Sequence, residues 1–277
     1  MLHGLNNDFL YSALQINVIF SDKIGNQKSP LGTAFFVRNK EEKICLVTNR
    51  HMIDLTYKCE AQERKNLEKY SITQIILFGK RKNPQPGLAP IEEQIFLPVP
   101  DQKITFPADY NNDVASFNDL QVRRIEGMEA ISDFFIPHKF LATENDIDTK
   151  LSVCDFVAFP GFPEYHDQKG KRPIFRTGTI SSDPRTSYSY RDSVNGDCIA
   201  YEAFSIGGSS GSPVFAMQKG FTGMVRIRGS RGVMLIGING GHINLCDEKG
   251  NIKLHSGMSY FYKSSVILEI IDRANGD

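Results

Sequence analysis

Three separated segments contain side chains that together are suited to nucleophilic catalysis. Residues 207–213 place Ser210 among glycines, which permit the tight turn and close substrate approach that a nucleophilic hydroxyl needs. An apolar run over residues 44–48 leads to His51, and an imidazole with a pKa of about 6.5 accepts protons at neutral pH. Asp113 precedes another apolar run and is able to orient an imidazole through its second nitrogen.

Each segment alone also has a simpler interpretation. A Gly-Ser-rich stretch is often a linker, and a single histidine after a strand is often a surface or core residue. Asp109 and Asp119 compete for the carboxylate role, and an aspartate at a strand entrance often serves only a turn. Asp113 is preferred because it adjoins the apolar run directly. The catalytic interpretation gains its weight from the three segments in combination.

The elements that must position these residues are mostly strands, because short runs rich in Val, Ile, Phe and Thr alternate with turn residues. Expected strands cover residues 14–20, 32–38, 44–48, 72–78, 115–118, 156–159, 174–180, 198–201, 212–216, 233–238 and 259–262. Helical segments are expected directly after His51, near residues 125–135, and over residues 264–274, where an apolar stripe recurs at helical spacing. So many short strands favour barrels over a single sandwich.

A polar connection between Ile136 and Lys150 marks the expected boundary between two domains. The first, residues 1–140, would be a β-barrel with His51 and Asp113. The second, residues 141–277, would be a β-barrel with Ser210 and the terminal helix.

In order and local sequence, the three segments resemble the trypsin/chymotrypsin superfamily of serine peptidases. That family carries T-x-x-H, D-[IV]-A and G-[DNS]-S-G-[GS]-P motifs, which match residues 48–51, 113–115 and 208–213. Residues 32–37, 158–163, 172–180 and 235–241 are similar to further segments of the family, most closely in bacterial trypsin-like peptidase domain proteins. The resemblance covers roughly residues 14–274. It implies an all-β fold of two six-stranded antiparallel Greek-key barrels, chymotrypsin-like, with a C-terminal α-helix.

The resemblance also implies roles for individual residues. Ser210 would form an acyl-enzyme, with His51 as base and then acid, and with Asp113 as orienter. The backbone N–H groups of Gly208 and Ser210 would form the oxyanion hole. Ser209 stands where digestive trypsins have the aspartate that captures a newly cut N-terminus, so no such activation is expected. The substrate-binding wall would comprise Thr179, Phe204, Ser205, Asn239, Gly240 and His242.

Composition narrows the class of protein further. Lys plus Arg and Asp plus Glu both number 32, so no net charge favours nucleic acid or an anionic membrane as a partner. No apolar stretch approaches the ~20 residues that span a bilayer, and the N-terminus lacks the pattern of a secretory signal. Five cysteines without a C-x-x-C pair and six scattered histidines predict no disulfide framework, metal site or cofactor. We therefore expect a cytoplasmic protein.

Several alternatives stay open on the sequence. The same fold could be a catalytically silent binding module, and an α/β-hydrolase esterase is disfavoured because its histidine would follow its serine. The expected partners are a protein or peptide substrate and an activating or gating protein. Position 204 carries no carboxylate, so a preference for Lys or Arg has no support. His242 either contacts a polar or acidic substrate side chain or is a plain loop residue, and the basic cluster Lys219, Arg226, Arg228 and Arg231 is either a solvated face or a binding site.

Overall fold

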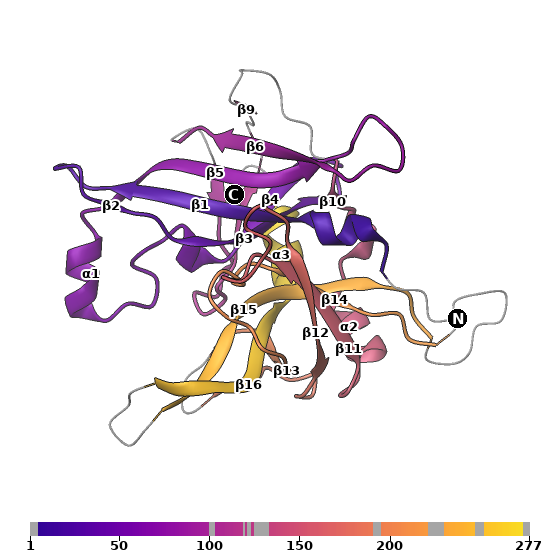
Figure 1. Cartoon of the computed structure of the whole chain (residues 1–277). Coiled ribbons are helices and arrows are strands. Elements are labelled where there is room, and N and C mark those ends of the chain that lie inside the picture. The colour runs from indigo at the N-terminus through magenta and orange to yellow at the C-terminus, as the bar shows by residue number, and fades with distance from the viewer. Residues whose placement is uncertain are drawn as a thin grey trace.

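The computed structural model of the chain describes residues 5–99, 103–118, 120, 123–124, 133–190, 195–220, 230–246 and 252–273. Its strands form two groups, one from each half of the sequence. In Figure 1 the sheet of the first half lies above the barrel of the second half.

The first group is a ten-stranded sheet, in which β1 and β6 alternate between buried and more exposed positions while β3, β4 and β8 are buried along almost their whole length. In β1 (Ala13–Ser21), Leu14, Ile16, Val18 and Phe20 all point into one core. The path of paired strands runs β7-β8-β4-β3-β1-β5-β6-β9, with β10 beside β3 and β2 beside β1. The other bounds are β2 (Gln27–Lys28), β3 (Leu31–Arg38), β4 (Ile44–Thr48), β5 (Ser71–Arg81), β6 (Ile91–Leu97), β7 (Lys103–Thr105), β8 (Ala115–Asn118), β9 (Arg123–Arg124) and β10 (Phe135–Ile136).

The second group is a closed six-stranded antiparallel barrel. Its strands are β11 (Phe156–Gly161), β12 (Ile174–Ile180), β13 (Cys198–Glu202), β14 (Pro213–Ala216), β15 (Met234–Cys246) and β16 (Ile252–Lys263). They pair in the order β11-β12-β13-β16-β15-β14, and β14 returns to β11. Large buried side chains such as Phe159, Tyr201 and Phe261 fill the interior. Because the barrel is closed, each strand pairs with a neighbour on both sides, and the strands form a rigid frame.

A shared apolar core joins the two groups. Val37 and Val47 of the sheet pack in one cluster with Phe215 and Leu235 of the barrel. The last helix, α3 (Ser264–Ile271), adds Ile267 and three neighbours to that cluster, because its apolar residues recur at helical spacing. The half that carries the predicted base and acid is thereby fixed against the half that carries the predicted nucleophile.

The remaining helical segments are short. They are η1 (Asn7–Ser12), η2 (Arg50–Met52), α1 (Ala61–Leu67), η3 (His138–Phe140) and α2 (Glu144–Lys150). α2 begins at a capping box, in which the Thr143 hydroxyl accepts from the Asp146 backbone while the Asp146 carboxylate accepts from the Thr143 backbone. It lies within the polar connection expected between the two halves.

The predicted fold class is confirmed: the chain is mostly β, with a closed barrel, a second sheet and a C-terminal helix. The bounds of β4, β8 and β12 are those expected from the sequence. The first half differs in detail, since its sheet has ten strands instead of six and one of its pairings, β10 with β3, is parallel. The helix expected near residues 125–135 falls largely outside the described residues, and its last residue, Phe135, lies in a strand.

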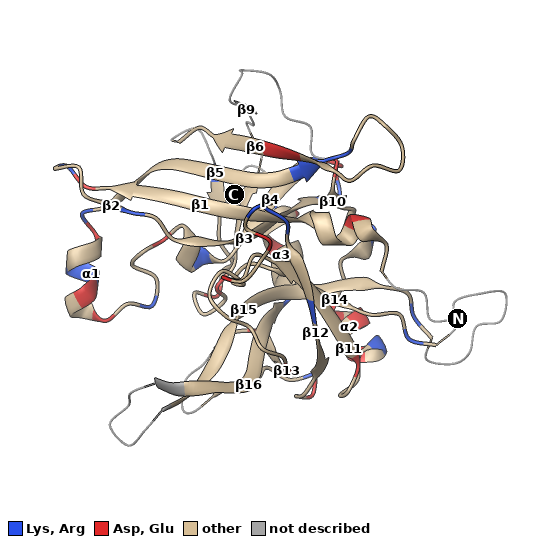
Figure 2. Cartoon of the chain, in the orientation of Figure 1, with Lys and Arg blue, Asp and Glu red and all other residues tan. Residues whose placement is uncertain are grey.

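Figure 2 shows positions of basic and acidic residues along the ribbon of both halves. Within the described ranges, no helix has the length and apolar content that crossing a membrane requires.

Candidate active site

His51 and Asp113 meet at the ends of two paired strands. Thr48 at the end of β4 pairs with Ala115 at the start of β8, so the chain leaves and enters the sheet at the same edge. The turn η2 follows β4 and carries His51, while Asp113 lies two residues before β8. His51 Nδ1 lies 2.5 Å from Asp113 Oδ2, and the His51 backbone N–H donates to Asp113 Oδ1 at 2.9 Å.

This carboxylate is held firmly. Asp113 is only 5% exposed, and the Asn49 side-chain amide donates to its backbone carbonyl at 2.7 Å. Asn49 is itself fully buried. Both carboxylate oxygens thus face His51, and the Nδ1–H tautomer leaves Nε2 available as a base. The supporting role of Asn49 was not anticipated from the sequence, because an asparagine between a strand and a turn is common.

The electrostatic environment adjusts His51 for proton transfer. Burial lowers its pKa, but the charge and hydrogen bond of Asp113 outweigh that effect, so the net pKa lies above the ordinary value of 6.5. The imidazolium that forms when His51 takes a proton is therefore stabilised by its partner.

The segment around Ser210 adopts a turn that requires glycine on both sides. Gly208 and Gly211 have φ of +85° and +86°, in the region that favours glycine. A Cβ on Gly208 would collide with the Phe162 carbonyl, and one on Gly211 would collide with the Thr33 carbonyl. The glycines expected from the sequence to shape the turn are therefore needed both for backbone conformation and for space.

Thr33 on β3 ties this turn to the first half of the chain. Its backbone N–H donates to the Ser210 carbonyl at 2.8 Å, and its hydroxyl donates to the Gly208 carbonyl at 2.8 Å. Its own carbonyl accepts from the Thr48 hydroxyl at 2.9 Å, three residues before His51. These bonds place the predicted nucleophile beside the strand pair that leads to the predicted base.

The surroundings of Gly32 also show that the turn with His51 and the turn with Ser210 lie close together. A Cβ on Gly32 would lie 2.8 Å from the Met52 sulfur and 3.3 Å from the Ser210 carbonyl oxygen. Met52 follows His51 directly, so the base-bearing turn and the nucleophile turn flank the same glycine. Ser210 is half-buried, as is His51, which leaves both open to solvent on one side.

The backbone N–H groups of the turn differ in whether they have an acceptor. The N–H groups of Ser209, Gly211 and Ser212 donate to the carbonyls of Ile206, Asn239 and Ser209 at 3.0 to 3.1 Å. The N–H groups of Gly208 and Ser210 donate to no residue in the described parts of the chain. An oxyanion hole requires N–H groups that are free to bind the substrate oxygen. The role of Gly208 and Ser210 as its donors stays a prediction, and their lack of an acceptor among the described residues is compatible with it.

The six predicted substrate-binding residues fall into two groups. Phe204 is 65% exposed, and Thr179 and His242 are half-buried. Ser205, Asn239 and Gly240 are buried, and the Asn239 amide bonds the Ser205 hydroxyl at 3.0 Å and the Ser209 carbonyl at 2.9 Å. The buried group supports the nucleophile turn from within, while a substrate role for any of the six stays a prediction.

A row of rings lies beside Phe204. The His255 ring lies 5.1 Å from that of Phe204 and stacks on that of His242 at 4.6 Å. Burial and the neighbouring His255 lower the pKa of His242, so it is neutral at pH 7.

The two members of the predicted basic cluster that the structure describes differ, since Lys219 is exposed and Arg231 is buried. Arg231 is buried and pairs with Asp155 at 3.1 Å, and Lys219 pairs with the other oxygen of that carboxylate at 2.9 Å. Arg226 and Arg228 lie outside the described residues. For Arg231 the solvated interpretation is wrong, because the guanidinium serves a buried ion pair.

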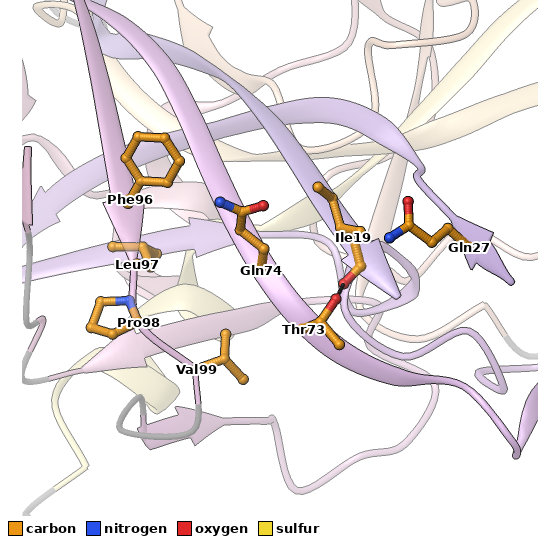
Figure 3. Close-up of a pocket in the computed structure, with 8 residues that line it drawn as sticks. All are labelled: Ile19, Gln27, Thr73, Gln74, Phe96, Leu97, Pro98 and Val99. Carbon is orange, nitrogen blue, oxygen red and sulfur yellow. Dashed lines mark hydrogen bonds between the residues drawn. The ribbon is translucent and has the colours of Figure 1, made fainter. Parts of the chain in front are cut away.

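In the parts of the chain that the structure describes, no three His, Cys, Asp or Glu side chains gather in an arrangement able to hold a metal ion. A pocket of about 360 Å³ lies on the sheet of the first half, at the ends of β1, β5 and β6 (Figure 3). The Thr73 hydroxyl on its wall donates to the Ile19 carbonyl at 3.1 Å. No predicted site residue lines this pocket.

Comparisons with known proteins support the fold. No protein-family model and no curated protein sequence matches the chain. Among solved structures, the thermostable serine protease AL20 from an extremophilic microorganism is similar, with a TM-score of 0.51, 13% identity, and coverage of 98% of this chain and 100% of that one. The protease Anisep from Arthrobacter nicotinovorans is also similar, with a TM-score of 0.52, 12% identity, and coverage of 94% and 93%. The chain therefore has the chymotrypsin-like fold of serine proteases.

Proposed function

We propose that the chain is a serine endopeptidase with His51, Asp113 and Ser210 as its catalytic triad. The observation that carries the proposal is the double contact of the Asp113 carboxylate with the side chain and backbone of His51. A histidine held at two points beside a glycine-flanked serine turn is the arrangement that activates a weak hydroxyl nucleophile.

In this proposal Ser210 attacks the carbonyl carbon of a peptide bond, and its proton passes to His51 Nε2. Asp113 stays ionised and stabilises the resulting imidazolium. The negative charge on the former carbonyl oxygen is met by the N–H groups of Gly208 and Ser210, a contribution of about 3 to 4 kcal/mol per donor in comparable enzymes. His51 then gives its proton to the leaving amine, and water hydrolyses the acyl-enzyme by the reverse sequence of proton transfers.

The substrate of this reaction would be a protein or peptide, as for the proteases of similar fold. We further propose that the chain is related to bacterial trypsin-like peptidases, with residues 1–140 and 141–277 as its two structural units. Phe204, Thr179 and His242 are the members of the predicted wall that are accessible to a substrate side chain. A narrow substrate range or a gating partner would restrain such an enzyme, and cleavage of few sequences in a peptide library would support that restraint.

Hydrolysis of a fluorogenic peptide library by the purified chain tests the function. We expect turnover by the wild type and a loss of about a million-fold in kcat for Ser210→Ala or His51→Ala, because removing either one disables the whole triad. Asp183→Ala is a suitable control, since its carboxylate pairs on the surface with Arg185. Equal turnover by wild type and Ser210→Ala would refute the proposal. Absent turnover with all candidate activators would favour a catalytically silent binding module.

A further inference from the structure

Arg176 reaches from the wall of the barrel to the nucleophile turn. It lies on β12, opposite Phe159 of β11, and its guanidinium sits 4.5 Å from the Phe159 ring centroid. Its Nη2 donates to the Ser209 hydroxyl at 2.5 Å, and its Nη1 donates to the Phe204 carbonyl at 2.9 Å. One planar side chain thus bonds the residue next to Ser210 and a residue of the predicted substrate wall.

The surroundings of the Arg176 guanidinium disfavour its positive charge. Ser209 is fully buried, and the Nε atom of Arg176 is buried without a hydrogen-bond partner. Burial lowers the pKa of the guanidinium, and no carboxylate of the described residues pairs with it; only tyrosine oxygens oppose the effect. Arg176 as a whole is half-buried, so its charge is partly removed from water without a carboxylate counterion, which costs free energy.

On the barrel side, the turn that Arg176 holds is also bonded by the Asn239 amide, which donates to the Ser205 hydroxyl and the Ser209 carbonyl. Gly207 and Gly208 contribute no side chains, and Gly208 has a positive φ that it can leave at little cost. The Gly208 carbonyl is fixed from the opposite side by the Thr33 hydroxyl. Thr33 therefore bonds the turn from the sheet, and Arg176 and Asn239 bond it from the barrel. Arg176 is the one of these three that reaches both the Phe204 carbonyl and the Ser209 hydroxyl.

We propose that Arg176 is a positioning residue that holds residues 204–209 in the conformation that aims the Gly208 and Ser210 N–H groups at the substrate. The catalytic part of this inference rests on the proposed function. Arg176 belongs to β12 of the barrel itself, so this support for the turn does not depend on a newly cut N-terminus. Ser209 is the matching neutral acceptor, small enough to take a short bond from a guanidinium.

Hydrogen exchange measures this role without any need for activity. In Arg176→Gln, we expect the protected amides of Ser209, Gly211 and Ser212 to exchange about tenfold faster or more, because a hydrogen bond to a charged group contributes about 1.5 to 3 kcal/mol. Arg185→Gln is the control, since Arg185 is exposed and pairs with Asp183, two residues earlier. Unchanged exchange across residues 204–212 in Arg176→Gln would overturn the proposal, whether or not the enzyme turns over peptides.

Kinetics separate positioning from general stability. Ser209→Ala removes one of the two bonds and leaves the Phe204 carbonyl contact, so it serves if Arg176→Gln does not fold. We expect kcat to fall about tenfold to a hundredfold in Ser209→Ala with KM nearly unchanged, because misplaced donors weaken only the transition state. Arg176→Lys should retain more of the wild-type kcat than Arg176→Gln, because it keeps the positive charge. Unchanged kcat in folded Ser209→Ala, or a rise in KM alone, would contradict the positioning role. Wild type without turnover would instead refute the proposed function, and the exchange result would still decide on Arg176.

Discussion

The substitution Asp113→Asn removes the charge beside His51 while keeping the size of the side chain. In the wild type both carboxylate oxygens accept, one from the His51 backbone at 2.9 Å and one from Nδ1 at 2.5 Å. An asparagine amide has only one accepting oxygen. If that oxygen keeps the backbone bond, the amide NH₂ faces Nδ1 and forces the imidazole into the tautomer with its proton on Nε2. That tautomer has no lone pair for the Ser210 proton.

The expected loss is large because the wrong tautomer disables the base entirely. In serine proteases this change costs about 10⁴-fold in kcat, which corresponds to about 5.5 kcal/mol in the activation free energy. The pKa of His51 should also fall, because Asp113 raises it while burial continues to lower it. In the wild type, activity should decline as pH falls through a pKa above 6.5. The same raised pKa stabilises the fold below pH 6.5, and that contribution fades as pH rises through the folded-state pKa.

Rate against pH for a fluorogenic peptide, together with thermal melts, measures these effects. Asp109→Asn is the matched control, because Asp109 is exposed four residues earlier and its carboxylate accepts from the backbone and side chain of Asn111. It should retain wild-type kcat. A kcat within tenfold of wild type for folded Asp113→Asn would refute the role of Asp113.

Three further outcomes follow from packing and charge. Gly211→Ala should destabilise the fold by more than Gly25→Ala, for which we expect a loss of about 1 kcal/mol. Both glycines have a positive φ, but only a Cβ at position 211 would collide with a neighbour, so equal melting temperatures of the two variants would contradict this prediction. Ile267→Ala should lower the free energy of unfolding by about 2 to 5 kcal/mol in urea titrations, because it is fully buried in the core between the halves, and a loss under about 1 kcal/mol would argue against that core. NMR titration should find the pKa of His242 below 6.5 in the wild type. In His255→Ala the pKa of His242 should be higher than in the wild type, although burial still lowers it, and an unchanged pKa would rule out the influence of His255.

Much of the fold was predictable because strand signals are local. β4 is a continuous run rich in β-forming residues, and the ends of β4, β8 and β12 were predicted correctly. β6 was missed because Glu92 and Glu93 interrupt its apolar alternation, although Ile95 and Leu97 are buried. α2 was missed because Ile147 is its one buried residue, and the capping box at Thr143 was its only clear signal.

The site was predictable to a different degree. Strand ends and glycines mark the positions of His51, Asp113 and Ser210, because those features are adjacent in sequence. Arg176 could not be recognised, since its partners lie 28 and 33 residues away and neither partner carries a charge. The burial of Asn239 was equally hidden, because its hydrogen-bond partners Tyr201, Ser205 and Ser209 lie 30 to 38 residues earlier in the chain.

Labelling with a fluorophosphonate, read by intact mass and peptide mapping, tests the assembled triad most directly. The reagent requires an activated serine and donors for the developing oxyanion, so it reports on both halves of the site at once. We expect one adduct per chain, located on Ser210, and none on Ser210→Ala or on unfolded protein. Wild-type chain that stays unmodified with every candidate activator present, or an adduct on another serine, would contradict the account.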